Sequence, residues 1–126
     1  MKQSYTYSEY EIQNGILIGR FNVEVIDLEI AKQITKDRHN FAKGKEYPTL
    51  VDFRKVSSTT KEARDFFNGS VAAKNILCMA VLIDSEVGRI IASFFLKFNK
   101  PAYELKLFTK EEEALKWLEE KCMKRE

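Results

Sequence analysis

The chain has 126 residues, 44% of them hydrophobic and 32% charged, which is the length and balance of one globular domain. Its 21 basic and 19 acidic residues are interspersed and leave a formal net charge of +2, so the sequence lacks the basic stripe that is typical of nucleic-acid-binding domains. No apolar run approaches the roughly 20 residues of a membrane helix, and no signal-peptide core follows Met1. We therefore expect a single cytoplasmic domain over residues 1–126 that neither binds nucleic acid nor inserts into a membrane.

The first expected element is a β-hairpin. Residues 5–12 alternate as a strand does, and residues 16–21 form a second, apolar strand. Between them, Asn14 and Gly15 make a turn signal because both tolerate a positive φ. The tyrosines of this region allow two interpretations, a cover for the core beside the first helix or an edge that pairs with a second copy of the chain. They are Tyr5, Tyr7 and Tyr10.

A helix is expected next. Asp27 can cap its start, and Gly44 can end it because glycine accepts the left-handed conformation of helix ends. Ile30, Ile34 and Phe41 fall on one face at helical spacing.

Strand and helix patterns then alternate three times. Apolar strands are expected at residues 49–53, 76–83 and 103–108, each followed by an amphipathic helix. This alternation predicts parallel pairing and an α/β fold of order β-β-α-β-α-β-α-β-α, with a mixed sheet of about five strands packed with helices.

Capping signals set the expected starts of these helices. Thr59 with Glu62 and Thr109 with Glu112 have the spacing of capping boxes, in which two side chains satisfy free N–H groups at a helix start. The helix between them is expected at residues 86–98.

The cysteines and the histidine give no sign of a metal or cofactor site. Cys78 lies in an apolar run and is interpreted as a small buried hydrophobe, while Cys122 lies near the end of the last helix. Their spacing fits no zinc motif, and two cysteines make no disulfide framework, so we expect reduced thiols. His39 is the only histidine and falls on a polar helix surface at residues 36–40. We expect no metal, no cofactor and no enzymatic activity.

Motifs along nearly the whole chain resemble those of a known fold group. They lie at residues 50–54, 62–67, 80–83, 89–96, Pro101 and 106–118. On these residues the chain is similar to small bacterial STAS/SEC14-like proteins of unassigned function, and through them to the STAS domain of the anti-sigma factor antagonists. The resemblance implies a SpoIIAA-like fold, a soluble bacterial protein and a non-catalytic regulatory or protein-interaction role.

The same resemblance points to a phosphorylation or anion site. In the antagonists, a serine at the start of the helix after the third strand is phosphorylated within an Asp-Ser-Ser-Gly motif. Ser57, Ser58, Thr59 and Thr60 stand at that place here, without the Asp before them or the Gly after them. Free N–H groups at a helix start also favour an anion. The alternative is that Thr59 or Thr60 simply caps the helix.

A second candidate site lies at the end of the third strand. Asp52, Arg54 and Arg64 could line the carboxyl end of the sheet, where ligands settle in open α/β folds. The alternative is a salt bridge that only fixes the strand end.

Two functional hypotheses remain open from the sequence. In the first, the domain binds a protein partner, possibly a second copy of itself, and Arg89, Ser93 and Leu96 on the outer side of the helix at residues 86–98 contribute contacts. In the second, the domain carries a small molecule or lipid, with the same apolar helix as one wall of a cavity.

Overall fold

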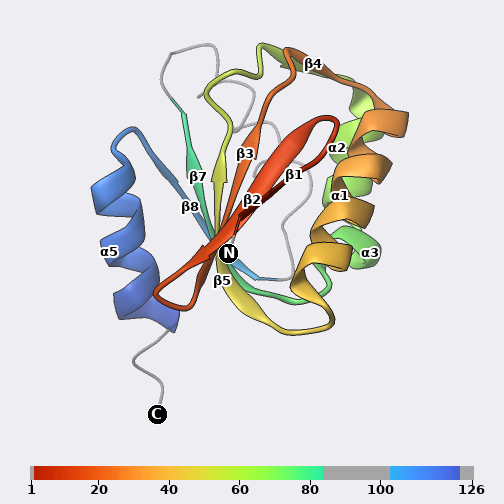
Figure 1. Cartoon of the computed structure of the whole chain (residues 1–126). Helices are drawn as coiled ribbons and strands as arrows, with labels where there is room; N and C mark the ends of the chain where they lie inside the picture. Colours follow the sequence, from red (N-terminus) through yellow and green to blue (C-terminus); the bar gives the residue numbers. More distant parts are fainter. Residues whose placement is uncertain (1, 84–102, 123–126) are drawn as a thin grey trace.

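The computed structural model describes residues 2–83 and 103–122 (Figure 1). The helix expected at residues 86–98, and with it Arg89, Ser93 and Leu96, lies outside the described residues.

A mixed sheet forms the centre of the molecule, with strand order β1-β2-β3-β5-β7-β8 (Figure 1). The first three strands pair antiparallel, and β3, β5, β7 and β8 pair parallel. The bounds are β1 Lys2–Ser4, β2 Ser8–Gln13, β3 Ile16–Phe21, β5 Tyr47–Asp52, β7 Ile76–Leu82 and β8 Glu104–Phe108. The α/β fold and the mixed sheet are therefore confirmed, and the described part of the sheet has six strands.

The N-terminal hairpin forms at the predicted turn, but its first strand is β2 Ser8–Gln13 and not residues 5–12. Asn14 and Gly15 have φ angles of 53° and 80°, and the last pair before the turn is Gln13 with Ile16. The additional strand, β1, arises because the chain bends between β1 and β2, where the N–H of Tyr5 donates to the Ser8 carbonyl at 2.7 Å.

Tyr10 supports one of the two interpretations of the tyrosines. Its side chain is 1% exposed, and its ring stacks on Phe41 with centroids 5.9 Å apart. Tyr10 lies opposite Gly19, where a Cβ would come within 2.7 Å of the Tyr10 ring, so a glycine is needed at this position. Tyr10 thus covers the core beside the first helix, while β1 forms the sheet edge.

The first helix, α1 Leu28–Ala42, begins at the predicted cap, since Asp27 Oδ1 accepts from the Ile30 N–H at 2.9 Å. Its end differs from the prediction. Lys43 already takes the left-handed conformation with φ 53°, and Gly44 follows with φ 81°, so the helix stops before Gly44.

A small second sheet shifts the start of the next helix to a later residue than the sequence predicts. β4 Val25–Ile26 pairs in parallel with β6 Ser58–Thr59, and the Thr60 N–H donates to the Ile26 carbonyl at 3.0 Å. Because Thr59 belongs to a strand, the capping box expected from Thr59 and Glu62 is wrong. Thr60 is the cap and accepts from the Ala63 N–H at 3.1 Å. The helices that follow are α2 Lys61–Phe67 and α3 Ser70–Ala73.

Helices cover both faces of the sheet. α5 Glu111–Cys122 lies on one face, and α1, α2 and α3 lie on the other (Figure 1). α5 begins later than the expected start at Thr109, since the Ala114 N–H donates to the Lys110 carbonyl at 3.2 Å. Under α5, the core consists of Ile16, Ile18, Leu50, Cys78, Ala80, Ala114, Leu118 and Cys122.

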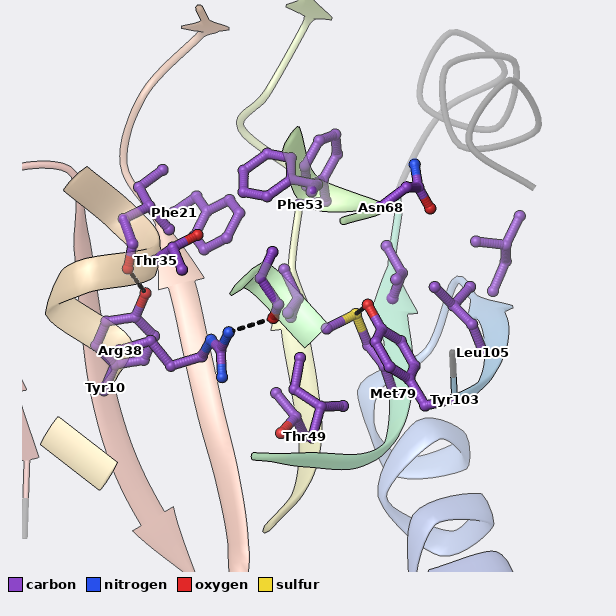
Figure 2. Close-up of a pocket in the computed structure, with 17 residues that line it drawn as sticks. Tyr10, Phe21, Thr35, Arg38, Thr49, Phe53, Asn68, Met79, Tyr103 and Leu105 are labelled. Atoms are coloured by element: carbon purple, nitrogen blue, oxygen red, sulfur yellow. Dashed lines mark hydrogen bonds between the residues drawn. The ribbon is translucent and has the colours of Figure 1, made fainter. Parts of the chain in front are cut away.

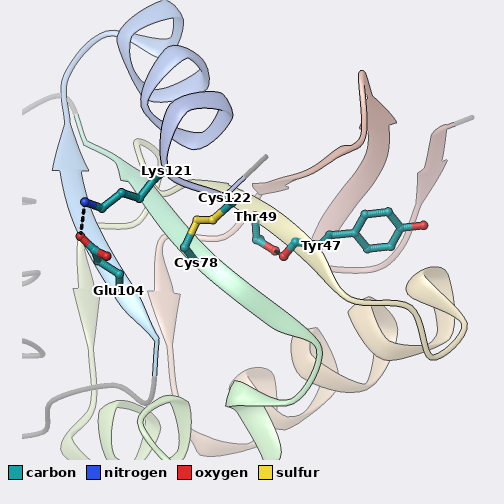
Figure 3. The surroundings of a disulfide bond; sticks show 6 residues. All are labelled: Tyr47, Thr49, Cys78, Glu104, Lys121 and Cys122. Carbon is teal, nitrogen blue, oxygen red and sulfur yellow. Dashed lines mark hydrogen bonds and ion pairs between the residues drawn. A yellow bond between two sulfur atoms is a disulfide. The ribbon is translucent and has the colours of Figure 1, made fainter. Parts of the chain in front are cut away.

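The two cysteines form a disulfide that joins β7 to the last turn of α5 (Figure 3). The expectation of reduced thiols is therefore wrong for this structure. Cys78 and Cys122 are 44 residues apart, so no local sequence motif predicts the bond. Packing of α5 on β7 brings their Cα atoms within 6.6 Å, inside the range that a disulfide spans.

Candidate functional site

Four charged side chains meet at the carboxyl ends of the central strands; we call them the strand-end cluster. Asp52 ends β5, Arg54 follows it, Arg20 lies opposite Asp52 on β3, and Glu111 begins α5. Arg54 donates to Asp52 from Nε at 2.9 Å and from Nη2 at 2.8 Å. Arg20 joins both carboxylates: its Nη1 is 3.0 Å from Asp52 Oδ2 and 2.8 Å from Glu111 Oε1, and its Nη2 is 3.0 Å from Glu111 Oε2.

The pairing fixes the charge of each group. Burial would raise the pKa of Asp52, but hydrogen bonds from Arg54 and Arg20 outweigh it and hold that pKa below its ordinary value. The hydrogen bonds from Arg20 lower the pKa of Glu111, against the opposing effect of burial. In return, hydrogen bonding to Glu111 raises the pKa of Arg20, and hydrogen bonding to Asp52 raises the pKa of Arg54. Both carboxylates are thus ionised and both guanidiniums charged near neutral pH.

The cluster connects the sheet to α5. The sequence predicted the nearness of Asp52 and Arg54 but missed Arg20 and Glu111. The position of Arg20 follows in part from the strand register, because Arg20 and Asp52 are partners on the neighbouring parallel strands β3 and β5. Glu111 also lies in the first helical turn, where a carboxylate is favoured by the helix dipole. The alternative interpretation, ion pairs that fix the strand end, describes the contacts of Asp52 and Arg54 well.

Arg64 lies elsewhere. Its Nη1 donates to the Thr59 carbonyl at 2.8 Å and is 3.4 Å from Thr59 Oγ1. These contacts join α2 to β6, so Arg64 belongs to the start of α2 and not to the strand-end cluster.

The hydroxyl segment at residues 57–60 divides into two parts. Thr60 is committed to the cap of α2, a helix of seven residues. Ser57 and Ser58 are exposed and precede the helix, with the N–H and Oγ of Ser57 both donating to the Glu24 carbonyl at 2.7 and 3.1 Å. The segment therefore presents two exposed serines beside β4, of which Ser57 is held by its hydrogen bonds to Glu24.

A cavity of about 100 Å³ lies on the opposite side of the sheet from α5 (Figure 2). α1, α2, α3 and the strands β3, β5, β7 and β8 all contribute to its walls. Arg38 reaches into this region between Tyr10 on one side and Met79 with Tyr103 on the other (Figure 2).

The expectation of a polar helix surface at residues 36–40 is wrong in part. Asp37 and Arg38 are only 6% and 7% exposed, because α3 packs against this turn and its Ala72 carbonyl accepts from Arg38 Nη2. His39 is partly buried, and that burial lowers its pKa, with the nearby positive charge of Arg38 acting in the same direction.

The described ranges also bear on metal sites and on membrane insertion. No group of three His, Cys, Asp or Glu side chains gathers within residues 2–83 and 103–122 in the manner of a metal site. No described helix has both the length and the apolar character that crossing a membrane requires.

Comparison with known proteins identifies the fold. A family described as a domain of unknown function, DUF7793, matches residues 10–121. No curated protein matches the chain. An uncharacterised protein of the DUF3478 family with a SpoIIAA-like fold, from Shewanella loihica PV-4, aligns with a TM-score of 0.64 at 20% identity, covering 92% of this chain and 98% of that one. The SpoIIAA-like fold is thereby confirmed.

A second solved structure is more distant in shape. It is a protein with unknown function from Arthrobacter sp. FB24, 25% identical, with a TM-score of 0.31 over 86% of this chain and 96% of that one.

Proposed function

We propose that this chain, which belongs to the DUF7793 family, is a non-catalytic regulatory module of STAS type that acts by binding a partner protein. The observation that carries the proposal is the internal pairing of the strand-end cluster. In open α/β sheets this edge is the usual place for ligands and reacting groups. Here Asp52 is held ionised by two guanidiniums, which makes it a poor proton donor near neutral pH.

Recognition is then assigned to a surface beside the cluster, the β4–β6 surface, formed by Val25, Ser57 and Ser58. Val25 and Ser58 are register partners in the small parallel sheet, and Val25 is 50% exposed. The hydrogen bonds from Ser57 to the Glu24 carbonyl hold the two segments together. An exposed apolar side chain beside two serines is suited to contact with a partner protein. Because the backbone of this surface is already fixed by hydrogen bonds, it loses little conformational entropy on binding, which favours the complex.

The serines give this surface a means of regulation. A phosphate on Ser57 or Ser58 would put a double negative charge beside Val25, where it would weaken an apolar contact or repel an acidic partner. The proposal also extends to Arg89, Ser93 and Leu96 as further partner contacts, although these residues lie outside the described ranges.

The experiment places a photo-cross-linking amino acid at Ser58 in one variant and at Val71 in another. Val71 is a matched control, because it is 57% exposed and lies on α3, away from β4 and β6. We expect a discrete adduct from position 58 and none from position 71. The adduct also shows whether the partner is a second copy of the chain or a different protein.

The purified partner then permits a quantitative test. Val25→Asp or Ser58→Glu should weaken its binding about tenfold or more, since a charge would enter the contact, and Val71→Asp should leave the affinity unchanged. Equal effects of the Val25 and Val71 substitutions would contradict the assignment of the surface.

A cytoplasmic location is part of the proposal and is tested by cell fractionation. We expect the chain in the soluble cytoplasmic fraction, and recovery from a secreted or membrane fraction would contradict this location.

A further inference from the structure

We propose that the cavity between α1 and the sheet binds a compact apolar monocarboxylate, with the guanidinium of Arg38 as its counter-charge. This inference goes beyond the proposed function and rests on other residues. The cavity and the β4–β6 surface can therefore be tested independently, and failure at one leaves the other standing.

The first observation is the setting of Arg38. Its side chain is 7% exposed, and its hydrogen bonds go to neutral groups. Nη1 donates to the Lys74 carbonyl at 3.2 Å, Nη2 donates to the Ala72 carbonyl, and Nη2 lies 3.4 Å from His39 Nε2. Within residues 2–83 and 103–122, no carboxylate forms an ion pair with Arg38. A buried cation without a counter-charge is costly, and burial accordingly lowers the pKa of Arg38.

The second observation is the character of the cavity. Apolar side chains from all the contributing strands form most of its wall: Phe21, Val51, Met79, Val81, Leu105 and Leu107. Three of the hydroxyls that reach it are already engaged as donors, and Thr35 adds a fourth hydroxyl to the wall. Tyr10 donates to the Ile34 carbonyl at 3.1 Å, Thr49 to the Tyr47 carbonyl at 3.1 Å, and Tyr103 contacts Met79 Sδ at 3.9 Å. Figure 2 shows Arg38 between Tyr10 and Tyr103, so one positive charge meets a mainly apolar wall to which Thr35 and Asn68 add polar groups.

This combination selects the chemistry of the ligand. An apolar body would contact the strand side chains, and an anionic group would complete the hydrogen bonding of the guanidinium. Guanidinium presents five N–H donors in a plane; the contacts above use three of them, so the Nε–H and the second N–H of Nη1 remain for an anionic group. Because Arg38 is only 7% exposed, such a charge-assisted pair is stronger than one at the surface.

Volume sets the size of the ligand. The cavity of about 100 Å³ is smaller than the roughly 150 Å³ engineered cavity that accepts benzene. Scaled from that cavity and its six-carbon ligand, it suits an apolar body of about four non-hydrogen atoms, with the carboxylate at Arg38 outside that count. The two acyl chains of a phospholipid exceed this space, so within the carrier hypothesis the structure favours a small acid over a lipid.

The test is calorimetric titration of the full chain with isovalerate and, in parallel, with isovaleramide. The amide has the same branched body and nearly the same shape but carries no charge. We expect isovalerate to bind at least about tenfold more tightly, because only the carboxylate neutralises Arg38. Absence of binding by isovalerate, or equal binding of acid and amide, would overturn the proposal.

Two variants assign the effect to this cavity. Arg38→Gln keeps a donor toward Ala72 and should remove the preference for the acid. This change could also weaken the packing of α1 on α3, so a second variant, Val81→Phe, is needed. It leaves Arg38 in place and fills the cavity, and it should abolish the binding of both compounds. Unchanged affinity for isovalerate in a folded Val81→Phe chain would also overturn the proposal. Laurate tests the expected size of the ligand. Tighter binding of this long-chain acid than of isovalerate would contradict the proposal that the ligand is compact.

Discussion

The two faces of the sheet differ in how closely their side chains pack against the helices that cover them. Under α5, Ile16, Ile18, Leu50 and Leu118 are all exposed by 2% or less, and the charges at the end of this face are paired with one another. Under α1, α2 and α3, the wall side chains surround a cavity, and Arg38 has no carboxylate partner within the described residues.

Alternation along β5 places these different environments next to each other in the sequence. Leu50 belongs to the core under α5, Val51 lines the cavity, and Asp52 joins the strand-end cluster. The comparison teaches that the face under α5 provides stability and fixed charge, while the face under α1 retains the space and the unpaired charge that binding requires. Each prediction below alters one face and compares it with the other or with the surface.

The largest effect is expected from the disulfide between Cys78 and Cys122. Opening it frees a loop with a sequence separation of 44 residues, which in the chain-entropy account costs about 4 kcal/mol of unfolding free energy. Urea unfolding with and without a reductant measures this loss. The double variant Cys78→Ala with Cys122→Ala is the control, since a reductant should no longer change its stability.

The next effect separates the two faces through the same chemical change. Leu118→Ala should lower the unfolding free energy by about 3 kcal/mol, because Leu118 is fully buried in the close-packed core. Leu107→Ala should cost only about 1 kcal/mol, because Leu107 already borders an open space and is partly exposed. Equal losses in urea unfolding would mean that the two faces are packed alike.

A smaller effect is expected from the strand-end cluster. Asp52→Asn leaves Arg20 and Arg54 facing each other without their shared carboxylate, and we expect a loss of about 2 kcal/mol at neutral pH. Glu104→Gln is the control, since its ion pair with Lys121 (Figure 3) is half exposed and should contribute less than about 1 kcal/mol.

The same variant has a defined pH dependence. Because the folded-state pKa of Asp52 lies below its ordinary value of 3.8, the pairing stabilises the fold fully above that value and is lost as the pH falls through the folded pKa. The difference in stability between the wild-type chain and Asp52→Asn should therefore narrow below about pH 4. A difference that stays constant down to acid pH would show that the charge of Asp52 is not responsible.

The smallest effect tests the start of α2, beside the face with the cavity. Thr60→Ala should cost about 1 kcal/mol, because it removes the acceptor for the Ala63 N–H. Thr59→Ala should cost less, because Thr59 lies in β6 and does not cap the helix. Thermal melts of the two variants measure this difference. A larger loss of stability from Thr59→Ala would support the capping box that the sequence suggests.

Local signals predicted most of the fold. The turn at Asn14 and Gly15 and the cap at Asp27 depend on residue types that act within three or four positions, so they can be identified without knowing what packs on them. The parallel strands follow from alternation of strand and helix patterns. The start of α2 was misplaced because β6 pairs with β4, a contact between segments more than 30 residues apart that leaves no local pattern.

The sites depend more strongly on distant contacts and were predicted less completely. Asp52 and Arg54 are neighbours in sequence, so their pairing was foreseeable, whereas Glu111 reaches them only after α5 folds back on the sheet. Arg38 was assigned to a polar surface because its neighbours are polar, and only the packing of α3 buries it. The disulfide likewise requires the packing of α5 on β7.

The central claim is that the strand-end cluster is a fixed ion-pair network and not a reacting centre. Its most direct test is the titration of the Asp52 carboxyl, followed by ¹³C NMR of the labelled side chain. The account predicts a pKa below the ordinary value of 3.8, because Arg54 and Arg20 hold the carboxylate ionised. A pKa raised well above that value would contradict the account and would mark Asp52 as a candidate proton donor at an active site.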